Sequence, residues 1–322
     1  MFVGLYVIPW WRAERTILLD ACTTRHADSV TPFVTRLRRT TRAIAALVAF
    51  FVLAGATYQG VATALERHRY VRPGGLVDAG GHQLHIYCTG EGAPLVILEA
   101  AAGSMSAGWA WVQPDVAKAT RVCSYDRAGL GWSEAGDGRY IPARVPEELR
   151  VLLDRANEIS PIVLVGYEAG ALFSRMYAAK FAENTAALVL IDDPATVETP
   201  MTATFPSAWP WLARVGILRL SGQLSSQALG LPGESGRAMR AFLNRPDHLT
   251  RAAMELSQLG TVEADARTVS VSPRIIVTSV AIGTRGQPAM IVTREDATRV
   301  TQAILATISR VRELDSSVTA ER

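Results

Sequence analysis

A carboxylate stands between two glycines at the end of a short apolar run. The run is PIVLVGY, residues 161–167, and the chain continues with Glu168, Ala169 and Gly170. Small residues two positions before and two after Glu168, here Gly166 and Gly170, allow a strand and the following helix to approach closely, which predicts a tight strand-to-helix turn. A carboxylate at such a turn can attack a substrate carbon and form an ester, which water must then hydrolyse with the help of a base.

A histidine is the usual base for that second step, and the C-terminal part of the chain contains none. The five histidines stand at positions 26, 68, 82, 85 and 248. His82 and His85 fall in a predicted strand far from the turn and are expected to be ordinary strand residues. His248 is expected in a solvated loop of the cap, with a position over the pocket as the alternative. Neither the number nor the placement of the histidines therefore predicts a catalytic base.

The composition limits the classes of function. The chain has 322 residues and is 49% hydrophobic, which is enough for one large core or two modest ones. Its net charge is +3 with both signs spread along the sequence, so no basic face for nucleic acid is expected. Three cysteines without a Cys/His cluster do not support a metal site, and no cofactor is expected.

Residues 43–65 carry no charge, and an α-helix needs about 20 apolar residues to cross a bilayer core. We expect a single transmembrane helix here, with a buried core helix as the alternative. Basic residues flank the stretch on both sides, and the heavier cluster, RLRRTTR at 36–42, precedes it. This asymmetry places the N-terminus in the cytoplasm and the main domain outside. Residues 1–42 are expected to be a poorly ordered extension.

Strand and helix patterns alternate within residues 70–315, the expected main domain. Residues 76–88 predict a β-hairpin that turns at Gly80 and Gly81. The short apolar runs that predict buried parallel strands are 94–100, 121–126, 161–167 and 187–193. The helices expected between and after them are 109–119, 146–158 and 169–182. This alternation predicts an α/β fold with a mostly parallel sheet covered by helices on both faces.

The alternation stops at about residues 195–271, where only helices and loops are predicted. Such an insertion is expected to form a helical cap over the carboxyl edge of the sheet. Two more strands are predicted at 274–280 and 288–292, followed by an amphipathic helix over 294–312.

Three segments resemble membrane-anchored bacterial α/β-hydrolases: GGHQLHIYCTGEGAPLVILEAAAGS, RVCSYDRAGLGWSEAG and VLVGYEAGALFSRMYAAKF. The resemblance covers roughly residues 70–195, and YDRAGLGWS at 125–133 is its most specific part. It implies the α/β-hydrolase fold with a Gly-x-Ser-x-Gly nucleophile turn. This chain departs from that pattern because Glu168 stands where the family has serine. The loop that carries the family's histidine, after the strand at 288–292, looks deleted.

The resemblance also implies where the other parts of the family's site would lie. Asp192 and Asp193 end a strand at one position for the acid that orients the histidine; without a histidine they are better interpreted as a helix cap or salt-bridge partner. Backbone amides near Ala102 and Ala169 would form the oxyanion hole.

The family's strand order, in addition, makes the strands of Cys88 and Cys123 neighbours. This arrangement implies a disulfide if the domain is exported, with two buried thiols as the alternative.

Three interpretations of the function remain open. In the first, the chain is a non-catalytic, degenerate member that binds a small apolar ligand or a partner, or is a decayed paralogue. In the second, it hydrolyses esters, epoxides or similar small apolar substrates through Glu168 or an unrecognised nucleophile. In the third, it is a conventional esterase or lipase whose catalytic residues lie at positions other than those assigned by the resemblance. The second lacks a base, and glutamate is one methylene longer than aspartate. The third needs another Gly-x-Ser-x-Gly, which is absent. We therefore expect a pseudoenzyme.

In that pseudoenzyme, the Glu168 carboxylate is expected to fold toward the amides around the turn, because free amides at a helix N-terminus favour negative charge. A carboxylate that points into solvent is the alternative.

Overall fold

The computed structural model describes residues 11–137, 139–158, 161–196, 207–283 and 290–320, with side chains between positions 34 and 317. The chain divides into two units, Met1–Ala54 and Gly55–Arg322. The first contains the N-terminal part of α1, Trp11–Arg69, and the second contains the rest of α1 and the main domain. Two expectations differ from this arrangement, because α1 is helical from Trp11 onward and the compact main unit starts at Gly55 instead of residue 70.

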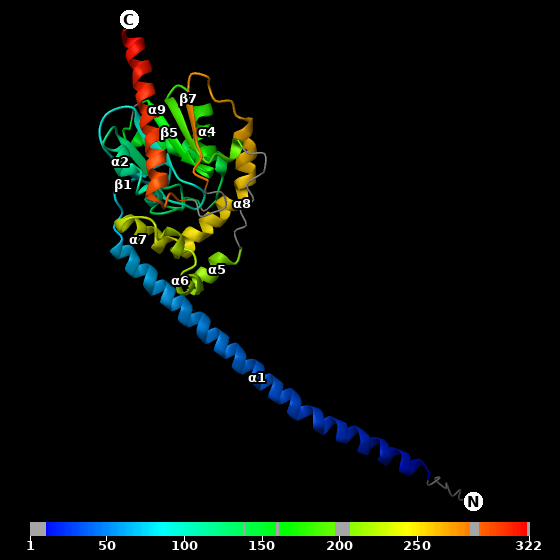
Figure 1. The fold of residues 1–322 in the computed structure, drawn as a ribbon. Helices are drawn as coiled ribbons and strands as arrows, with labels where there is room; N and C mark the ends of the chain where they lie inside the picture. The colour runs from blue at the N-terminus through cyan, green and yellow to red at the C-terminus, as the bar shows by residue number, and fades with distance from the viewer. Residues whose placement is uncertain (1–10, 138, 159–160, 197–206, 284–289, 321–322) are drawn as a thin grey trace, which may run out of the picture. The chain divides into compact units, whose positions relative to one another are not determined.

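A seven-stranded sheet of the described residues forms the centre of the second unit, in the order β1-β2-β4-β3-β5-β6-β7 (Figure 1). The strands are β1 Gly75–Asp78, β2 Gln83–Thr89, β3 Leu95–Glu99, β4 Val122–Tyr125, β5 Ile162–Tyr167, β6 Thr185–Ile191 and β7 Ile276–Val280. The hairpin of β1 and β2 is antiparallel, β2 pairs antiparallel with β4, and the pairs from β4 to β7 are parallel. The predicted mostly parallel sheet is therefore confirmed.

Helices cover both faces of this sheet. They are α3 Val145–Arg155 and α4 Ala169–Lys180 on one face, and η1 Ser106–Trp109, α2 Gln113–Val116 and α9 Arg294–Ala320 on the other. Successive residues of a strand point to opposite faces, so Ile97 packs in the first layer while Val96 and Leu98 pack in the second. Because both faces are covered, the central strands are apolar without alternation.

The chain between β6 and β7 forms the predicted helical cap. Its elements are η3 Pro194–Thr196, α5 Trp209–Arg214, α6 Ile217–Ser221, η4 Ser225–Ala228, α7 Gly233–Phe242 and α8 Pro246–Thr268. Leu218, Met239 and Phe242 are buried in a cluster that also includes Met105 of the loop before η1. This shared cluster fixes the cap to the main domain.

The connection between β7 and α9 differs from its prediction. Of the strand expected at 288–292, Pro288 and Ala289 lie outside the described residues, and 290–292 have no strand structure. Met290 and Ile291 are buried all the same. A short apolar run signals burial, which here comes from packing and not from a strand. Of the residues between β7 and α9, the described ones, 281–283 and 290–293, are neither helix nor strand. The connection is therefore not deleted, and its sequence contains no histidine.

Candidate functional site

The turn between β5 and α4 has the geometry that its glycines predict. Glu168 lies between Tyr167 and α4 with φ 47° and ψ −112°, a conformation that is unfavourable for any residue except glycine. A Cβ at Gly166 would lie 2.4 Å from the carbonyl oxygen of Gly170, and a Cβ at Gly170 would lie 2.2 Å from that of Glu99. Only glycine fits at either position, and the side chain that the strained turn presents is that of Glu168.

The Glu168 carboxyl group is only partly exposed, and no hydrogen bond or ion pair joins it to another described residue. Burial, and then the negative charge of nearby Asp192, raise its pKa to about 7. A carboxylate that accepted hydrogen bonds from backbone amides would instead have a lowered pKa. For the described part of the chain, the expectation that amides hold Glu168 as an anion is therefore wrong.

The two aspartates that follow β6 have different partners. Asp192 has φ 45°, and its Oδ1 accepts a hydrogen bond of 2.9 Å from the amide of Ile282, in the loop after β7. Asp193 is buried and forms an ion pair with Arg175, with the nearest atoms 2.6 Å apart. Asp193 therefore acts as a salt-bridge partner, whereas Asp192 fixes the loop after β7 and lies close enough to Glu168 to influence its charge.

A buried arginine holds the loop after β3, which contains Ala102. Arg127 donates hydrogen bonds to the carbonyl oxygens of Ala100 at 2.6 Å and Ala101 at 2.8 Å. Among the described residues, none accepts a hydrogen bond from the amide of Ala102 or from the amide of Ala169. Both donors that an oxyanion hole would need are therefore unused by the described residues.

The same arginine links the main domain to the cap. Its guanidinium lies 2.5 Å from a carboxylate oxygen of Glu99 on β3 and 2.8 Å from one of Glu255 on α8. Tyr125 donates a further hydrogen bond to Glu99, and burial raises the pKa of Glu99. Arg127 and the two glutamates are almost fully buried, so each group depends on the others for compensation of its charge.

His248 lies on α8 and is 1% exposed, so the expectation of a solvated loop histidine is wrong. Its Nδ1 accepts a hydrogen bond from the amide of Gly131, and its Nε2 lies 3.0 Å from the carbonyl oxygen of Gly103. This pattern requires the neutral ring with the proton on Nε2. Burial lowers the pKa of His248, in agreement with a neutral ring. Both nitrogens are engaged, and the ring is not free to act as a base.

His85 is also fully buried and engaged at both nitrogens. Its Nδ1 lies 2.9 Å from Asp126, and its Nε2 lies 2.5 Å from the carbonyl oxygen of Pro73. Burial disfavours the charged ring, but the attraction of Asp126 outweighs it and raises the pKa of His85. His85 therefore ties the segment before β1 to the sheet, a more specific role than that of an ordinary strand residue.

The cysteines of β2 and β4 face one another. Cys88 and Cys123 are paired in the register of the two strands, with Cα atoms 4.0 Å apart and sulfur atoms bonded at 2.01 Å. Their sulfurs lie within 4.8 Å of a carboxylate oxygen of Glu158, a group that could hold a metal if the thiols were free. In the disulfide form, neither sulfur is a thiolate ligand.

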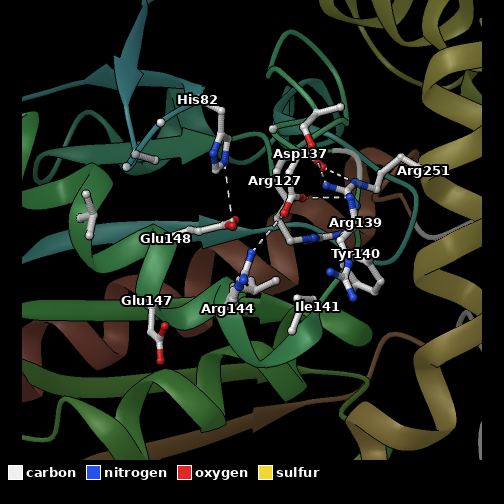
Figure 2. Close-up of a pocket in the computed structure, with 18 residues that line it drawn as sticks. His82, Arg127, Asp137, Arg139, Tyr140, Ile141, Arg144, Glu147, Glu148 and Arg251 are labelled. Carbon is white, nitrogen blue, oxygen red and sulfur yellow. Dashed lines mark hydrogen bonds and ion pairs between the residues drawn. The ribbon is translucent and has the colours of Figure 1, made fainter.

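Cavity space is small beside the turn and larger elsewhere. Ala101, Tyr167 and Met290 line a cavity of about 10 Å³, close to the volume of a single water position. A cavity of about 470 Å³ lies between the β1–β2 turn, the loop after β4 and α3 (Figure 2). In Figure 2, His82 faces Glu148 across this larger cavity, with 3.9 Å between Nε2 and Oε1. Substrate-sized space thus occurs in the main domain at some distance from the turn.

A family model described as "alpha/beta hydrolase fold" matches residues 93–247. The solved enol-lactonase from Burkholderia xenovorans LB400 has the same fold, with a TM-score of 0.52 over 73% of this chain and 100% of that one, at 19% sequence identity. The chain has the α/β-hydrolase fold. At that identity the similarity concerns the fold alone.

Several proteins are similar to part of this chain in sequence. One is an uncharacterized vacuolar membrane protein of Saccharomyces cerevisiae, which is 31% identical over 135 residues. A 2-hydroxymuconate semialdehyde hydrolase of Pseudomonas sp. is 30% identical over 136 residues. The matches cover 36% and 41% of this chain, and 21% and 47% of the two relatives. The chain therefore corresponds to about a fifth of the yeast protein and to just under half of the hydrolase.

The buried charges around the turn were not predicted from the sequence. Glu99 ends an otherwise apolar strand, and Arg127 lies in the YDRAGLG segment, so a charge in each apolar setting was a usable signal. The burial of Glu255 could not be predicted in this way, because this residue lies on a long helix with charges spread along it. Its burial follows from how the cap packs on the domain, which one sequence does not specify.

Proposed function

We propose that this chain is a non-catalytic protein with the α/β-hydrolase fold, anchored by a single transmembrane helix at residues 43–65, which binds a small apolar ligand without hydrolysing it. The observation that carries the proposal is the state of Glu168. It occupies the nucleophile position with a pKa of about 7, and no histidine is available beside it. His85 and His248 are engaged elsewhere, and the residues outside the described ranges contain no further histidine.

The chemistry of a carboxylate nucleophile supports this proposal. Near pH 7 about half of the Glu168 carboxyl groups carry a proton, and a protonated carboxyl group is a poor nucleophile. Attack by the ionised half on an epoxide carbon would open the ring and leave an ester on Glu168. Hydrolysis of that ester needs an activated water, and a positioned histidine commonly accelerates such proton transfers by roughly 10²–10⁴-fold.

Labelling with a fluorophosphonate probe, combined with an acyl-ester assay, tests the proposal. The full-length protein is expected to show neither labelling nor turnover, and Glu168→Ser is expected to gain no meaningful esterase activity, because no histidine would deprotonate the new hydroxyl. An active α/β-hydrolase with the intact serine and histidine serves as the positive control. Robust turnover by the wild type or by the serine variant would contradict a non-catalytic role.

A carboxylate-dependent hydrolase is the second candidate. It is favoured by the strained turn at Glu168 together with the unused amides of Ala102 and Ala169. Its test is incubation with a small epoxide or ester, followed by mass spectrometry of the peptide that contains Glu168. A substrate-derived mass on that peptide, absent from Glu168→Gln, would support this candidate. An unmodified peptide would leave the non-catalytic proposal in place.

The membrane anchor is supported by the surface of α1. Residues Val34–Arg69 form the one described helix that is long and apolar enough to cross a bilayer, and only 6% of its most apolar window is buried. On the cap, Trp211 is 69% exposed and Leu220 is 72% exposed. Large exposed apolar surface of this kind favours contact with lipid. The name of the yeast relative also places that protein in a membrane.

The proposed orientation has a cytoplasmic N-terminus and an extracytoplasmic main domain. The basic cluster at 36–42 favours it, and a disulfide between Cys88 and Cys123 fits an oxidising compartment. Carbonate extraction is expected to leave the protein in the membrane pellet. Protease added to the outside of intact cells is expected to digest the main domain; protection of that domain would contradict the orientation, and release by carbonate would contradict the anchor.

A further inference from the structure

A second cavity, of about 440 Å³, lies on the side of the sheet formed by β2 and β4. Volumes from about 300 Å³ upward are typical of sites for small molecules. Half of the residues that line it are aromatic, alanine or proline residues, among them Tyr87, Ala107, Ala110, Ala117 and Trp132. None of the lining residues belongs to the turn at Glu168.

The polar groups on the floor of this cavity are already bonded to one another. Ser124 donates to Gln113 Oε1 at 2.7 Å, and Gln113 Nε2 donates to the carbonyl oxygen of Tyr87 at 2.9 Å. The hydroxyl of Ser106 lies 3.4 Å from His85 Nδ1. These internal bonds leave the apolar side chains and the hydroxyl groups of Tyr70 and Tyr87 for contact with a ligand, a lining that suits a hydrocarbon with a polar end.

One wall of the cavity is the segment that directly follows α1. Arg69 ends α1, and residues 70–73 continue to β1. A helix rises about 1.5 Å per residue, so Arg69 lies roughly 6 Å beyond Leu65, the last residue of the proposed membrane span. The cavity therefore lies at the C-terminal end of the helix that contains the proposed membrane span. Val71 in this wall is 80% exposed, which adds an apolar side chain at the same level.

The mouth of the cavity carries positive charge. Arg69 and Arg72 are exposed, and neither forms an ion pair with a described residue. Glu234 also lines the cavity, but its carboxylate pairs with Arg237. The hydrogen bond from Arg237 lowers the pKa of Glu234, and the charge of Arg69 also contributes. With Glu234 paired to Arg237, the two arginines beside the apolar walls match a lipid with an anionic headgroup.

We propose that this cavity binds one acyl chain of an anionic lipid, with the headgroup against Arg69 and Arg72. The proposal rests on the membrane anchor proposed above, because the anchor brings the cavity to the lipid surface. It assigns a binding site away from the turn at Glu168. The headgroup chemistry is a carboxylate or phosphate at the end of a hydrocarbon chain, so a free fatty acid and a lysophospholipid are separate arms of the test.

The test uses the full-length protein purified in a non-ionic detergent. A fatty acid with a photoreactive diazirine near its methyl end is cross-linked, and the labelled peptides are identified by mass spectrometry. Labelling is expected on peptides with Tyr87, Ala107 or Trp132. A parallel measurement follows the displacement of a fluorescent fatty acid by unlabelled fatty acid, by an anionic lysophospholipid and by lysophosphatidylcholine. The anionic lipids are expected to displace at least tenfold better.

Two cavity-filling variants, Ala110→Phe and Ala117→Leu, are expected to weaken binding at least tenfold. Ala143→Phe, at an exposed position of η2 (Pro142–Arg144) outside the cavity, is the matched control and is expected to bind as the wild type does. Thermal unfolding of each variant checks that the fold is retained. Arg69→Gln with Arg72→Gln is expected to remove the preference for anionic lipids, and Arg310→Gln, at an exposed position of α9, is its control.

Wild-type affinity in both folded cavity-filling variants, or labelling only outside the cavity, would overturn the proposal. Equal displacement by anionic and zwitterionic lipids would remove the role of the arginines and with it the proposed lipid class. The anchor is judged separately by carbonate extraction. The binding assay is done in detergent and therefore does not depend on the anchor. Release by carbonate with intact lipid binding would contradict the anchor alone. Retention in the pellet without lipid binding would contradict the lipid site alone.

Discussion

Arg127 and Glu255 form a buried ion pair whose nearest atoms are 2.8 Å apart, and this pair connects the loop after β4 to helix α8 of the cap. Glu255 also accepts a hydrogen bond of 2.9 Å from the amide of Gly103. One carboxylate on the cap therefore holds both Arg127 and the loop that carries Ala102. The geometry around the turn therefore depends on the cap being in place, and Leu259 and Val262 of α8 also pack in one buried cluster with Ala169 of the turn.

Removal of the Glu255 charge should strongly destabilise the protein. Glu255→Gln leaves Arg127 buried with less compensation, and breaking a buried pair typically costs about 3–5 kcal/mol. Chemical denaturation monitored by circular dichroism measures the loss. Glu234→Gln, in the exposed pair with Arg237, is the matched control and is expected to change nothing measurable. Equal stability of the two variants would show that the buried pair contributes no more than a surface pair.

The titration of Glu168 should make stability depend on pH in a defined direction. Its folded pKa of about 7 exceeds the ordinary value of 4.5. The folded chain therefore holds the proton while the unfolded chain loses it, and stability falls as pH rises from about 4.5 to 7. Glu168→Gln removes this loss, so the variant should equal the wild type at pH 4 and exceed it by at most about 3 kcal/mol at pH 8.

Thermal midpoints of Glu168→Gln and the wild type across this pH range check the direction. Glu183→Gln, at an exposed position after α4, controls for the removal of one carboxylate. A Glu168→Gln variant that is less stable than the wild type at pH 8 would mean that the carboxylate is held as an anion, as the sequence alone suggested.

The disulfide should contribute to stability through the loop that it closes. Cys88 and Cys123 are 35 residues apart, and a cross-link of such a loop typically stabilises by about 2–4 kcal/mol. Cys88→Ala with Cys123→Ala should lower the thermal midpoint, and a reducing agent should do the same to the wild type but not to the double variant. Cys22→Ser is the control. If reducing agent leaves the wild type unchanged, the two cysteines are free thiols in the protein studied.

The fold and the frame of the turn could be predicted because both depend on local sequence. The apolar runs that became β3, β5 and β6 are short and continuous, as expected for strands buried on both faces. Gly166 and Gly170 specify a close approach that no other residue allows. Such features follow from a few adjacent residues and need no knowledge of the distant chain.

The state of the site could not be predicted because it depends on residues that are distant in sequence. The pKa of Glu168 follows from burial and from the charge of Asp192, which follows the neighbouring strand β6. His248 looks like a polar loop residue in sequence, yet α8 carries it to the amide of Gly131, more than a hundred positions earlier. The sequence therefore predicted that the turn favours the ionised form of Glu168, whereas the raised pKa shows that it favours the protonated form. The position of Glu168 between β5 and α4 was predicted correctly.

At the junction between α1 and the cap, two glycines of the same helix have different surroundings. A Cβ at Gly55 would lie 2.2 Å from the carbonyl oxygen of Val215, whereas a Cβ at Gly60 meets nothing within 4 Å. Nearby, Gln59 donates a hydrogen bond of 2.8 Å to the carbonyl oxygen of Asn244. Gly55→Leu should therefore force α1 away from the cap and lower the thermal midpoint, at a cost of about 1–3 kcal/mol for overpacking.

Gly60→Leu is the matched control, because it adds the same side chain to the same helix on an open face. It should be neutral or slightly stabilising, since leucine has a higher helix propensity than glycine by roughly 0.5–1 kcal/mol. Both variants raise the apolarity of α1 equally, so a difference between them reports on packing against the cap and not on membrane insertion. Limited proteolysis of the purified protein gives a second measurement, in which Gly55→Leu should be cut faster after α1 and Gly60→Leu should not. If both variants unfold and are cut as the wild type is, residues 55–69 do not pack against the cap in the way that their contacts indicate.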